Sequence, residues 1–188
     1  MSRARISEKR SRLVRAADRL VYENGFEQTT LADIAKASKV PLGNVYYYFK
    51  TKDAIGEAVV AERARQHRAA REMWDGLPDP KQRLLAFTQM TIDNRDMLAK
   101  SGCPIGSLCQ ELHKDGGKLA ERASDMFADF LAWLEKQFRE LGKGEESRDL
   151  AVYLMSVLQG ATLLTLSFND SDYIARQSSR LKAWIKKL

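Results

Sequence analysis

Apolar residues recur with helical spacing along almost the whole chain. The first stripe has the spacing i, i+4, i+7, i+8, which is typical of one face of an α-helix. Its members are Leu13, Ala17, Leu20 and Val21. This helix is predicted to end at Gly25, because glycine accepts the left-handed conformation of a helix C-terminus. A capping-box-like pattern from Thr30 to Asp33 predicts the start of a second helix. After a break at residues 38–41, a third short helix is expected to run to about Lys50.

The rest of the chain is also predicted to be helical, in mostly longer segments. The expected helices cover about residues 54–75, 80–100, 104–112, 118–140, 149–168 and 171–188. Segments that contain glycine, proline or serine separate most of them. We find neither an alternating run convincing enough for a strand nor an internal repeat. The sequence therefore predicts an all-α protein with about nine helices.

Composition excludes several classes of protein. A chain of 188 residues with 44% hydrophobic residues is long enough to bury a core. Its two cysteines, Cys103 and Cys109, are too few for a disulfide scaffold and fit reduced thiols in the cytoplasm. No apolar run approaches the roughly 18 residues of a membrane span, and no signal-peptide apolar block follows the basic amino terminus. We therefore expect a cytoplasmic protein with no membrane partner.

The positive charge is concentrated near the amino terminus. Residues 1–53 hold 11 of the 31 Lys and Arg but only 6 of the 25 Asp and Glu, which is +5 of the net +6. This asymmetry predicts a polyanionic partner for the first part of the chain. The alternative on charge alone is a solvated basic tail from Arg3 to Arg12.

The second and third helices, with a short break between them, match a helix-turn-helix. At about 100° per residue, Val45, Tyr48 and Phe49 lie on the inward side of the third helix. The opposite side displays Gly43, Tyr47 and Lys50, flanked by Asn44 and Tyr46. Asparagine and tyrosine hydrogen-bond to base edges and phosphates, and glycine permits a close backbone approach, so this face suits a DNA major groove. The alternative is that the three tyrosines at 46–48 form a packing cluster, which stays open for Tyr48 in particular.

Residues 29–35, TTLADIA, and residues 40–53, VPLGNVYYYFKTKD, closely resemble the DNA-binding domain of the TetR (tetracycline-repressor) family, as does Gly25-Phe26. The resemblance implies a DNA-binding domain over residues 1–53 and a helical effector-binding and dimerisation domain over residues 54–188. It implies that Thr30, Tyr48 and Lys52 contact the DNA backbone. The implied groove-facing residues are Gly43, Asn44, Tyr46 and Tyr47. Many family members have a polar pair where this chain has Pro41-Leu42, so Leu42 offers only an apolar contact, for example to a thymine methyl.

The resemblance also implies a homodimer that binds a palindromic operator, an inverted repeat in double-stranded DNA, and represses transcription until a small-molecule effector binds. A dimer is expected independently, because one helix-turn-helix buries too little DNA surface and two half-sites lie about 34–36 Å apart. The interface is predicted on the helix over residues 149–168, where small and apolar residues alternate. The candidates are Ser156, Val157, Gly160, Ala161 and Leu164. The family resemblance points to this helix and the last one, packed as a four-helix bundle. The alternative, that this helix is the buried centre of its own domain, is compatible with that prediction.

Two features of the larger domain are candidates for effector recognition. Aromatic and methionine residues suit an apolar pocket, although each is also a normal core residue. They are Met90, Met97, Met126, Phe127, Phe130 and Trp133. The second feature is Cys103, which precedes a helix that begins at Pro104; nearby N–H groups there favour the thiolate. This segment resembles a Gly-Cys-Pro segment of one TetR sub-group, some of whose members respond to oxidants or electrophiles. The alternative is that Cys103 is a small buried residue.

Other classes of function have less support. Cys109 and His113 are four residues apart on one helix, but no orienting partner for a nucleophile is evident. The two cysteines and His113 lack a fourth ligand and suitable spacing for a metal site. We therefore expect neither enzyme activity nor a metal or cofactor. The main alternative is an architectural nucleic-acid-binding protein without effector response, which would have no use for the residues after 53. Release of DNA by a small molecule distinguishes the two.

Overall fold

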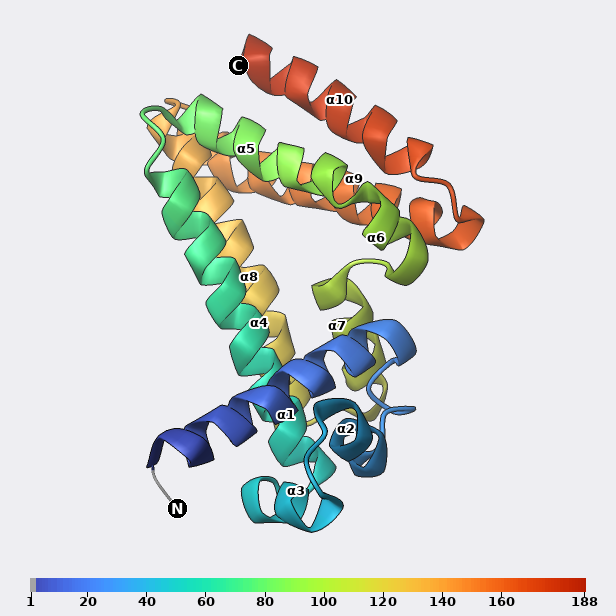
Figure 1. Cartoon of the computed structure of the whole chain (residues 1–188). Coiled ribbons are helices and arrows are strands. Elements are labelled where there is room, and N and C mark those ends of the chain that lie inside the picture. The colour runs from blue at the N-terminus through green and yellow to red at the C-terminus, as the bar shows by residue number, and fades with distance from the viewer. Residues whose placement is uncertain (1–2) are drawn as a thin grey trace. The chain divides into compact units, whose positions relative to one another are not determined.

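The computed structural model describes the backbone of residues 3–188 and the side chains from Ser7 onward, and this part of the chain is helical (Figure 1). It forms ten α-helices and one short 3-10 helix, and no strand occurs among the described residues. The prediction of an all-α protein is confirmed. The helices are α1 (Arg3–Asn24), α2 (Leu31–Ser38), α3 (Leu42–Tyr48), α4 (Lys52–Asp75), α5 (Pro80–Asp93), α6 (Arg95–Ser101), α7 (Pro104–Asp115), α8 (Lys118–Glu140), η1 (Gly144–Glu146), α9 (Ser147–Phe168) and α10 (Asp172–Lys187).

The main departure from the predicted helices is a break at Asn94, which divides the segment predicted over residues 80–100 into α5 and α6. The Asn94 side-chain amide donates a hydrogen bond to the Met90 carbonyl at 2.7 Å. Asparagine competes in this way with the helical hydrogen bonds of the main chain. Two smaller differences are that α3 ends at Tyr48, before an extended Phe49, and that α7 continues to Asp115.

The internal contacts divide the chain into two compact units. The amino-terminal unit consists of the residues up to His67 together with Ser107–Ser124. The carboxy-terminal unit consists of Arg68–Gly106 and Asp125–Leu188. The helices α4, α7 and α8 therefore each contribute residues to both units. The division does not coincide with residue 53, which we predicted as a functional boundary.

The core of the amino-terminal unit is formed by apolar residues of α1 to α4. Its members include Leu13, Ala17, Ile34, Val45, Phe49, Ile55 and Val59. Beside it, Arg63 is almost completely buried, and its Nε lies 2.6 Å from Asp18 Oδ1. A second Arg63 nitrogen donates to the Asp18 carbonyl at 3.2 Å. This hydrogen-bonded ion pair fixes α1 against α4, because a buried charge is tolerated only when it is paired.

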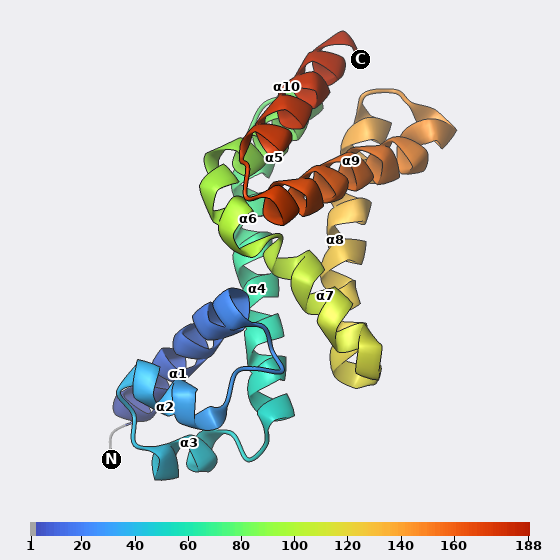
Figure 2. The ribbon, with the colours of Figure 1, turned by 90° about the vertical axis from the view of Figure 1, so that its right-hand side faces the viewer.

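In the carboxy-terminal unit, α10 packs against both α5 and α9, and α6 packs against α9 (Figure 2). The buried hydroxyls of Thr91 and Ser178 share a hydrogen bond of 2.8 Å between α5 and α10. The backbone amide of Ile174 donates to Thr165 Oγ1 at 3.0 Å, which joins the start of α10 to α9. These buried polar groups are therefore paired across helices, which offsets the cost of their desolvation.

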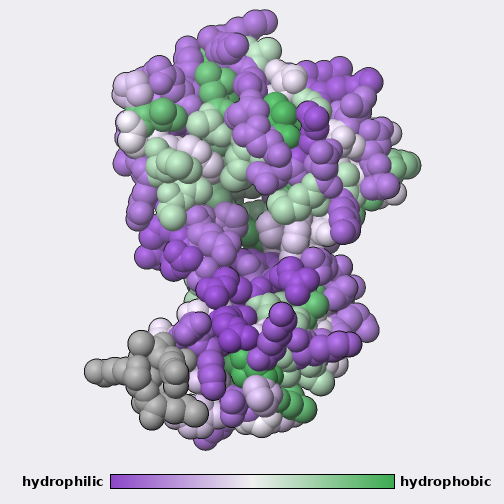
Figure 3. Space-filling model, in the orientation of Figure 1, coloured by the Kyte–Doolittle hydropathy of each residue, from purple (hydrophilic) through white to green (hydrophobic). Residues whose placement is uncertain are grey.

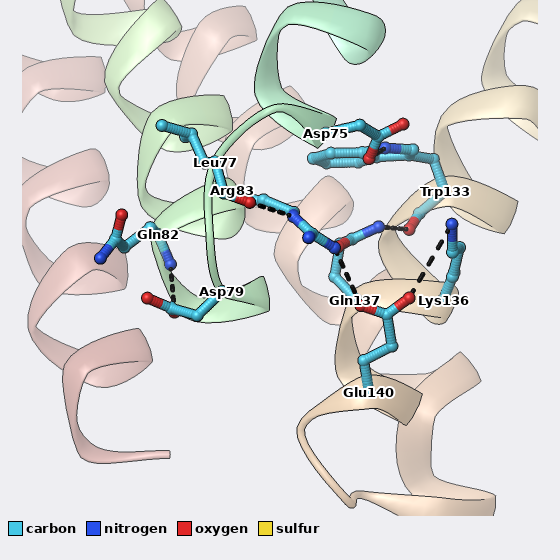
Figure 4. Close-up of polar contacts among 9 residues, drawn as sticks. All are labelled: Asp75, Leu77, Asp79, Gln82, Arg83, Trp133, Lys136, Gln137 and Glu140. Atoms are coloured by element: carbon cyan, nitrogen blue, oxygen red, sulfur yellow. Dashed lines mark hydrogen bonds and ion pairs between the residues drawn. The ribbon is translucent and has the colours of Figure 1, made fainter.

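A polar network joins the turn between α4 and α5 to α8 (Figure 4). Arg83 donates to the Leu77 carbonyl at 3.0 Å and to Glu140 Oε2 at 2.9 Å. It also donates at 3.2 Å to the side-chain oxygen of Gln137, which is fully buried. Asp75 accepts the Trp133 indole N–H at 2.9 Å. The network satisfies Gln137 and holds the turn in one position.

One part of the chain differs from the expectation about membranes. Gly144–Phe168 is a helical segment long and apolar enough, by length and composition, to cross a bilayer. The expectation that no segment approaches this length and composition is therefore wrong. Of the apolar window, 39% is buried inside the structure, and a core helix passes the same test.

Candidate nucleic-acid interface

The second helix begins at a complete capping box. Thr30 is the N-cap, and its hydroxyl oxygen accepts the Asp33 backbone N–H at 3.1 Å. In return, Asp33 Oδ2 accepts the Thr30 backbone N–H at 3.1 Å and the Thr30 hydroxyl at 2.5 Å. These bonds lower the pKa of Asp33 below its ordinary value of 3.8, and the bond from the Thr30 hydroxyl has the largest effect. Thr30 is exposed, but its hydroxyl proton is already bonded to Asp33.

The turn between α2 and α3 is short and well defined. Lys39 has φ 55° and ψ 38°, and its backbone N–H bonds back to carbonyls of α2. Arg12 of α1 donates to the Ser38 carbonyl at 2.5 Å and to the Lys39 carbonyl at 3.3 Å. Val40 is buried in the turn, and Pro41 is the N-cap of α3. The chain thus forms the predicted helix-turn-helix, and Arg12 anchors the turn to α1.

The third helix has one buried and one exposed face. Val45 is fully buried and Phe49 nearly so, which confirms the inward side that the sequence predicted. Leu42 is 41% exposed, Tyr46 52% and Tyr47 73%. These are large apolar or aromatic side chains displayed to solvent on a helix of seven residues. Exposed side chains of this kind indicate a binding surface.

The other predicted contacts of α3 differ in exposure. Asn44 is half-buried and Gly43 exposed, and no atom lies within 4 Å of the place where a Gly43 side chain would begin. Tyr48 is half-buried against the core, and its ring meets Tyr47 edge-on at 5.2 Å. The packing alternative therefore applies to part of the Tyr48 side chain and not to Tyr46 or Tyr47.

Lys52, at the first position of α4, has several interactions inside the amino-terminal unit. Its ammonium donates to the Glu27 carbonyl at 2.7 Å and lies 3.5 Å from a Glu27 carboxylate oxygen. It also lies 4.9 Å from the centre of the Phe26 ring. The side chain remains 32% exposed. The predicted phosphate contact would therefore use a charge that is partly neutralised by Glu27.

Arg10 is a candidate that the sequence reasoning missed. This exposed residue of α1 places its guanidinium 5.3 Å from the centre of the Phe49 ring. Phe49 directly follows α3, so a positive charge lies beside the end of that helix. The only signal in the sequence was the general excess of basic residues before Arg12, which does not single out one of them.

The predicted interface residues of α9 do not all face outward. Ser156, Gly160 and Leu164 are exposed, and Val157 is half-buried. Ala161 is only 4% exposed and packs inside its own unit, so in a single chain it offers little surface to a second one. The reason is that Ala161 lies on the α9 face that carries the buried Leu154 and Leu158.

The exposed side of α9 also carries apolar residues that were not predicted as interface residues. They are Val152, Tyr153, Leu163, Leu166 and Phe168. On the face shown in Figure 3, hydrophilic residues predominate and hydrophobic residues are scattered between them. Scattered exposed apolar residues need no explanation, but a row of them along one helix indicates a contact surface.

The candidate effector residues are divided between the core and the surface. Met126, Phe130 and Trp133 are buried, and the rings of Phe130 and Trp133 lie 5.6 Å and 6.1 Å from that of Phe87. These rings fill the space between their helices by packing on one another. Met90 and Phe127 are half-buried, and Met97 is 43% exposed. The six residues therefore differ in burial, from the core to the surface.

Cys103 is half-buried between Gly102, which has φ 74°, and the start of α7. Its Sγ accepts the Gly106 backbone N–H at 3.3 Å and the Gln159 side-chain N–H at 3.5 Å. Cys109 is buried, and neither cysteine forms a disulfide. His113 contacts the Cys109 carbonyl at 2.9 Å and Ser124 at 3.1 Å. The sulfur that receives two N–H groups is therefore that of Cys103.

Comparison with known proteins agrees with this architecture. Residues 13–59 match the bacterial regulatory proteins of the tetR family, and residues 80–179 match the C-terminal domain of LmrA/YxaF-like transcriptional regulators. The HTH-type transcriptional regulator LmrA of Bacillus subtilis is 24% identical over 185 residues, which cover 96% of this chain and 98% of LmrA. The HTH-type transcriptional repressor NemR of Escherichia coli is 27% identical over 114 residues, which cover 60% of this chain and 56% of NemR. A crystal structure of a TetR-family regulator from Streptomyces coelicolor has a TM-score of 0.83 at 18% identity and covers 96% of both chains.

A helix-turn-helix with an exposed third helix, followed by a larger set of helices, defines a DNA-binding transcriptional regulator. The chain belongs to the TetR family, with a carboxy-terminal domain of the LmrA/YxaF-like type.

Proposed function

We propose that this chain is a dimeric repressor that binds an inverted-repeat operator through α3 and leaves it when an effector binds. The observation that carries the proposal is that α3 has a buried side, with Val45, and an exposed side, with Tyr46 and Tyr47, and that the residue after it, Phe49, is buried too. Burial of the first face fixes the helix in the unit. The second face is then available to a major groove.

Base recognition is assigned to the residues at the start and on the exposed side of α3. Asn44 has an amide that donates and accepts hydrogen bonds, as does an adenine edge. Leu42 offers an apolar surface to a thymine methyl. Gly43 leaves room for close approach of the backbone, and Tyr46 and Tyr47 supply aromatic surface with hydroxyl groups.

Contacts to the DNA backbone are assigned to Thr30, Tyr48 and Lys52, and they fix the position of α3 without reading sequence. For Thr30 the contact requires its hydroxyl proton to turn from Asp33 to a phosphate, or its backbone N–H to be used instead. For Lys52 it requires an ammonium hydrogen that does not bond to Glu27. Both residues retain enough exposure for this.

Dimerisation is assigned to the exposed side of α9. Ser156 and Gly160 allow close approach of a second helix, and Val157 and Leu164 supply apolar area. The absence of any atom within 4 Å of a Gly160 side-chain position in the described structure leaves room for a partner helix there. Two copies of α9 and α10 would form a four-helix bundle.

The effector is assigned to the carboxy-terminal domain over residues 54–188, and its class is a small thiol-reactive molecule. This assignment is supported by the contacts of Cys103, whose sulfur accepts the Gly106 and Gln159 N–H groups and is half-buried. A thiolate that adds to an electrophilic carbon forms an S–C bond, and the carbanion or leaving group takes up the electron pair. The added group would have to displace Gln159, which lies against the sulfur. The resemblance to the Gly-Cys-Pro sub-group favours this class of effector.

The proposal implies a cytoplasmic protein without enzyme activity. The alternative is an architectural DNA-binding protein that does not respond to an effector. Its DNA contacts would be the same, so its distinguishing property is that no small molecule or thiol reagent releases the DNA.

The experiment is selection of bound sequences from random double-stranded DNA, followed by affinity measurements on the enriched site. We expect an inverted repeat, and we expect Asn44→Ala with Tyr47→Ala to remove the preference for it. Gln110→Ala, an exposed change on α7, is the matched control. Selective binding that survives the loss of both Asn44 and Tyr47 would overturn the assignment of α3.

A further inference from the structure

A carboxylate distant in sequence binds the turn between α1 and α2. Glu111 of α7 accepts the backbone N–H of Phe26 at 2.8 Å through Oε2 and that of Glu27 at 2.7 Å through Oε1. Both oxygens of one side chain are thus used, on two consecutive amides. Hydrogen bonds from N–H groups to an ionised carboxylate are about twice as strong as those between neutral groups. All three residues belong to the amino-terminal unit.

The turn is shaped to receive this carboxylate. Gly25 has φ 89°, a conformation that side-chain-bearing residues rarely adopt. A side chain at this position would begin 3.1 Å from Glu111 Oε1 and 3.3 Å from Oε2. Glycine is therefore needed both for the backbone conformation and for the approach of Glu111.

The opposite side of the turn is held by Lys52. Its ammonium bonds to the Glu27 carbonyl at 2.7 Å, while Glu111 bonds to the Glu27 amide. The Thr29 hydroxyl donates to the Gly25 carbonyl at 2.7 Å and closes the turn. The next residue is Thr30, the N-cap of α2. The position of the start of α2 thus depends on the bonds that Glu111 makes to the amides of Phe26 and Glu27 and that Lys52 makes to the Glu27 carbonyl, a few residues before Thr30.

We propose that Glu111 is a positioning residue for operator binding, which fixes the turn at residues 25–27 and through it the start of α2. The inference rests on the proposed DNA-binding function. Glu111 does not act on DNA directly, because a carboxylate repels phosphates. Its effect is that Thr30 and the helix-turn-helix already have their DNA-binding geometry in the DNA-free protein. Less of the chain then has to become ordered when DNA binds.

The test compares Glu111→Ala and Glu111→Gln with the wild-type chain. Glu111→Ala removes both acceptors, and we expect about a tenfold rise in the operator Kd, which corresponds to about one of the two charge-assisted hydrogen bonds that are lost. Glu111→Gln keeps one acceptor oxygen without the charge and should lie between the two. Glu121→Ala removes an exposed carboxylate of α8 and should bind like the wild-type chain.

Two readouts separate positioning from other roles. Hydrogen exchange of the Phe26 and Glu27 amides, measured by NMR without DNA, should accelerate in Glu111→Ala while exchange in the core of the unit is unchanged. The dependence of log Kd on log salt should keep its slope, because no phosphate contact is lost. A changed slope, or accelerated exchange throughout the unit, would contradict the inference.

The outcomes also distinguish this inference from the proposed function. If the wild-type chain selects an inverted repeat and Glu111→Ala binds it equally well, the positioning role is wrong and the function stands. If the wild-type chain selects no site, both are wrong, even when the two amides exchange as expected.

Discussion

Gly56, in the first turns of α4, lies against the side chains of Phe26 and Leu119, which leave no room for a side chain at position 56. A Cβ atom added at this position would lie 2.7 Å and 3.0 Å from two atoms of the Phe26 ring and 2.8 Å from a methyl carbon of Leu119. Carbon atoms in contact are normally about 3.5–4.0 Å apart. Gly56→Ala therefore forces Phe26 or Leu119 to move by several tenths of an ångström or more.

Two opposing effects determine the result. Alanine is favoured over glycine inside a helix by about 1 kcal/mol. Overpacking of a well-packed core costs about 1–3 kcal/mol. The cost here lies toward the upper end, because Phe26 is a rigid, buried ring whose backbone amide is bonded to Glu111. The net expectation is a loss of about 2 kcal/mol, which for a chain of this size lowers the Tm by about 4–8 °C.

The assay is thermal and urea unfolding at fixed protein concentration, with Gly43→Ala as the matched control. Gly43 is helical and exposed, with no atom within 4 Å of a new side chain, so its substitution should leave the Tm unchanged or raise it. We also expect Gly56→Ala to weaken operator binding, since Phe26 lies in the turn that precedes α2. A Gly56→Ala chain that unfolds at or above the wild-type temperature would refute the packing argument.

Three further predictions concern the capping box, the dimer and the thiol. The lowered pKa of Asp33 means that its ionised form stabilises the fold; this contribution is complete well above pH 3.8 and is lost as the pH falls through the lower folded value. The difference in urea midpoint between the wild-type chain and Asp33→Asn should therefore shrink as the pH is lowered from neutral to acid. A difference that stays constant would contradict the stabilising role of the ionised Asp33 carboxylate. Gly160→Trp should give folded monomers with weakened operator binding, because the side chain projects away from its own chain; light scattering that still reports a dimer would exclude α9 as the interface. N-ethylmaleimide should release operator DNA from the wild-type chain but not from Cys103→Ser, and equal release from both would remove Cys103 as the sensor.

The local sequence was sufficient to predict the helix-turn-helix and the side of its third helix that is buried. The Thr30–Asp33 capping box depends on residues three positions apart, and the structure contains both of its reciprocal bonds. The position of Val45 likewise determines the buried side of α3 and exposes Tyr47, because helical geometry relates position to direction. Phe49 is buried as predicted, although it follows α3 in an extended conformation. The DNA-contacting roles of these residues remain predictions.

Other features depended on interactions that the hydrophobic pattern does not show. The segment over residues 80–100 has a continuous helical pattern, but the chain divides at Asn94, whose side chain bonds to the Met90 carbonyl four positions earlier. Ala161 has the small side chain expected at a helix interface, but it lies on the face of α9 that is buried within its own unit. In both cases a residue type permitted two structures, and contacts that the pattern does not encode selected one.

The sequence by itself determined the helical class, the family resemblance and the exposed residues of α3, since each follows from spacings of a few residues. Only the tertiary structure decided that Glu111 binds amides 85 and 84 positions away, and that Gln159 lies against Cys103 from 56 positions away. The physical reason is that a hydrogen bond between distant residues depends on how the helices pack, which is set by the whole core and not by the residues that form the bond.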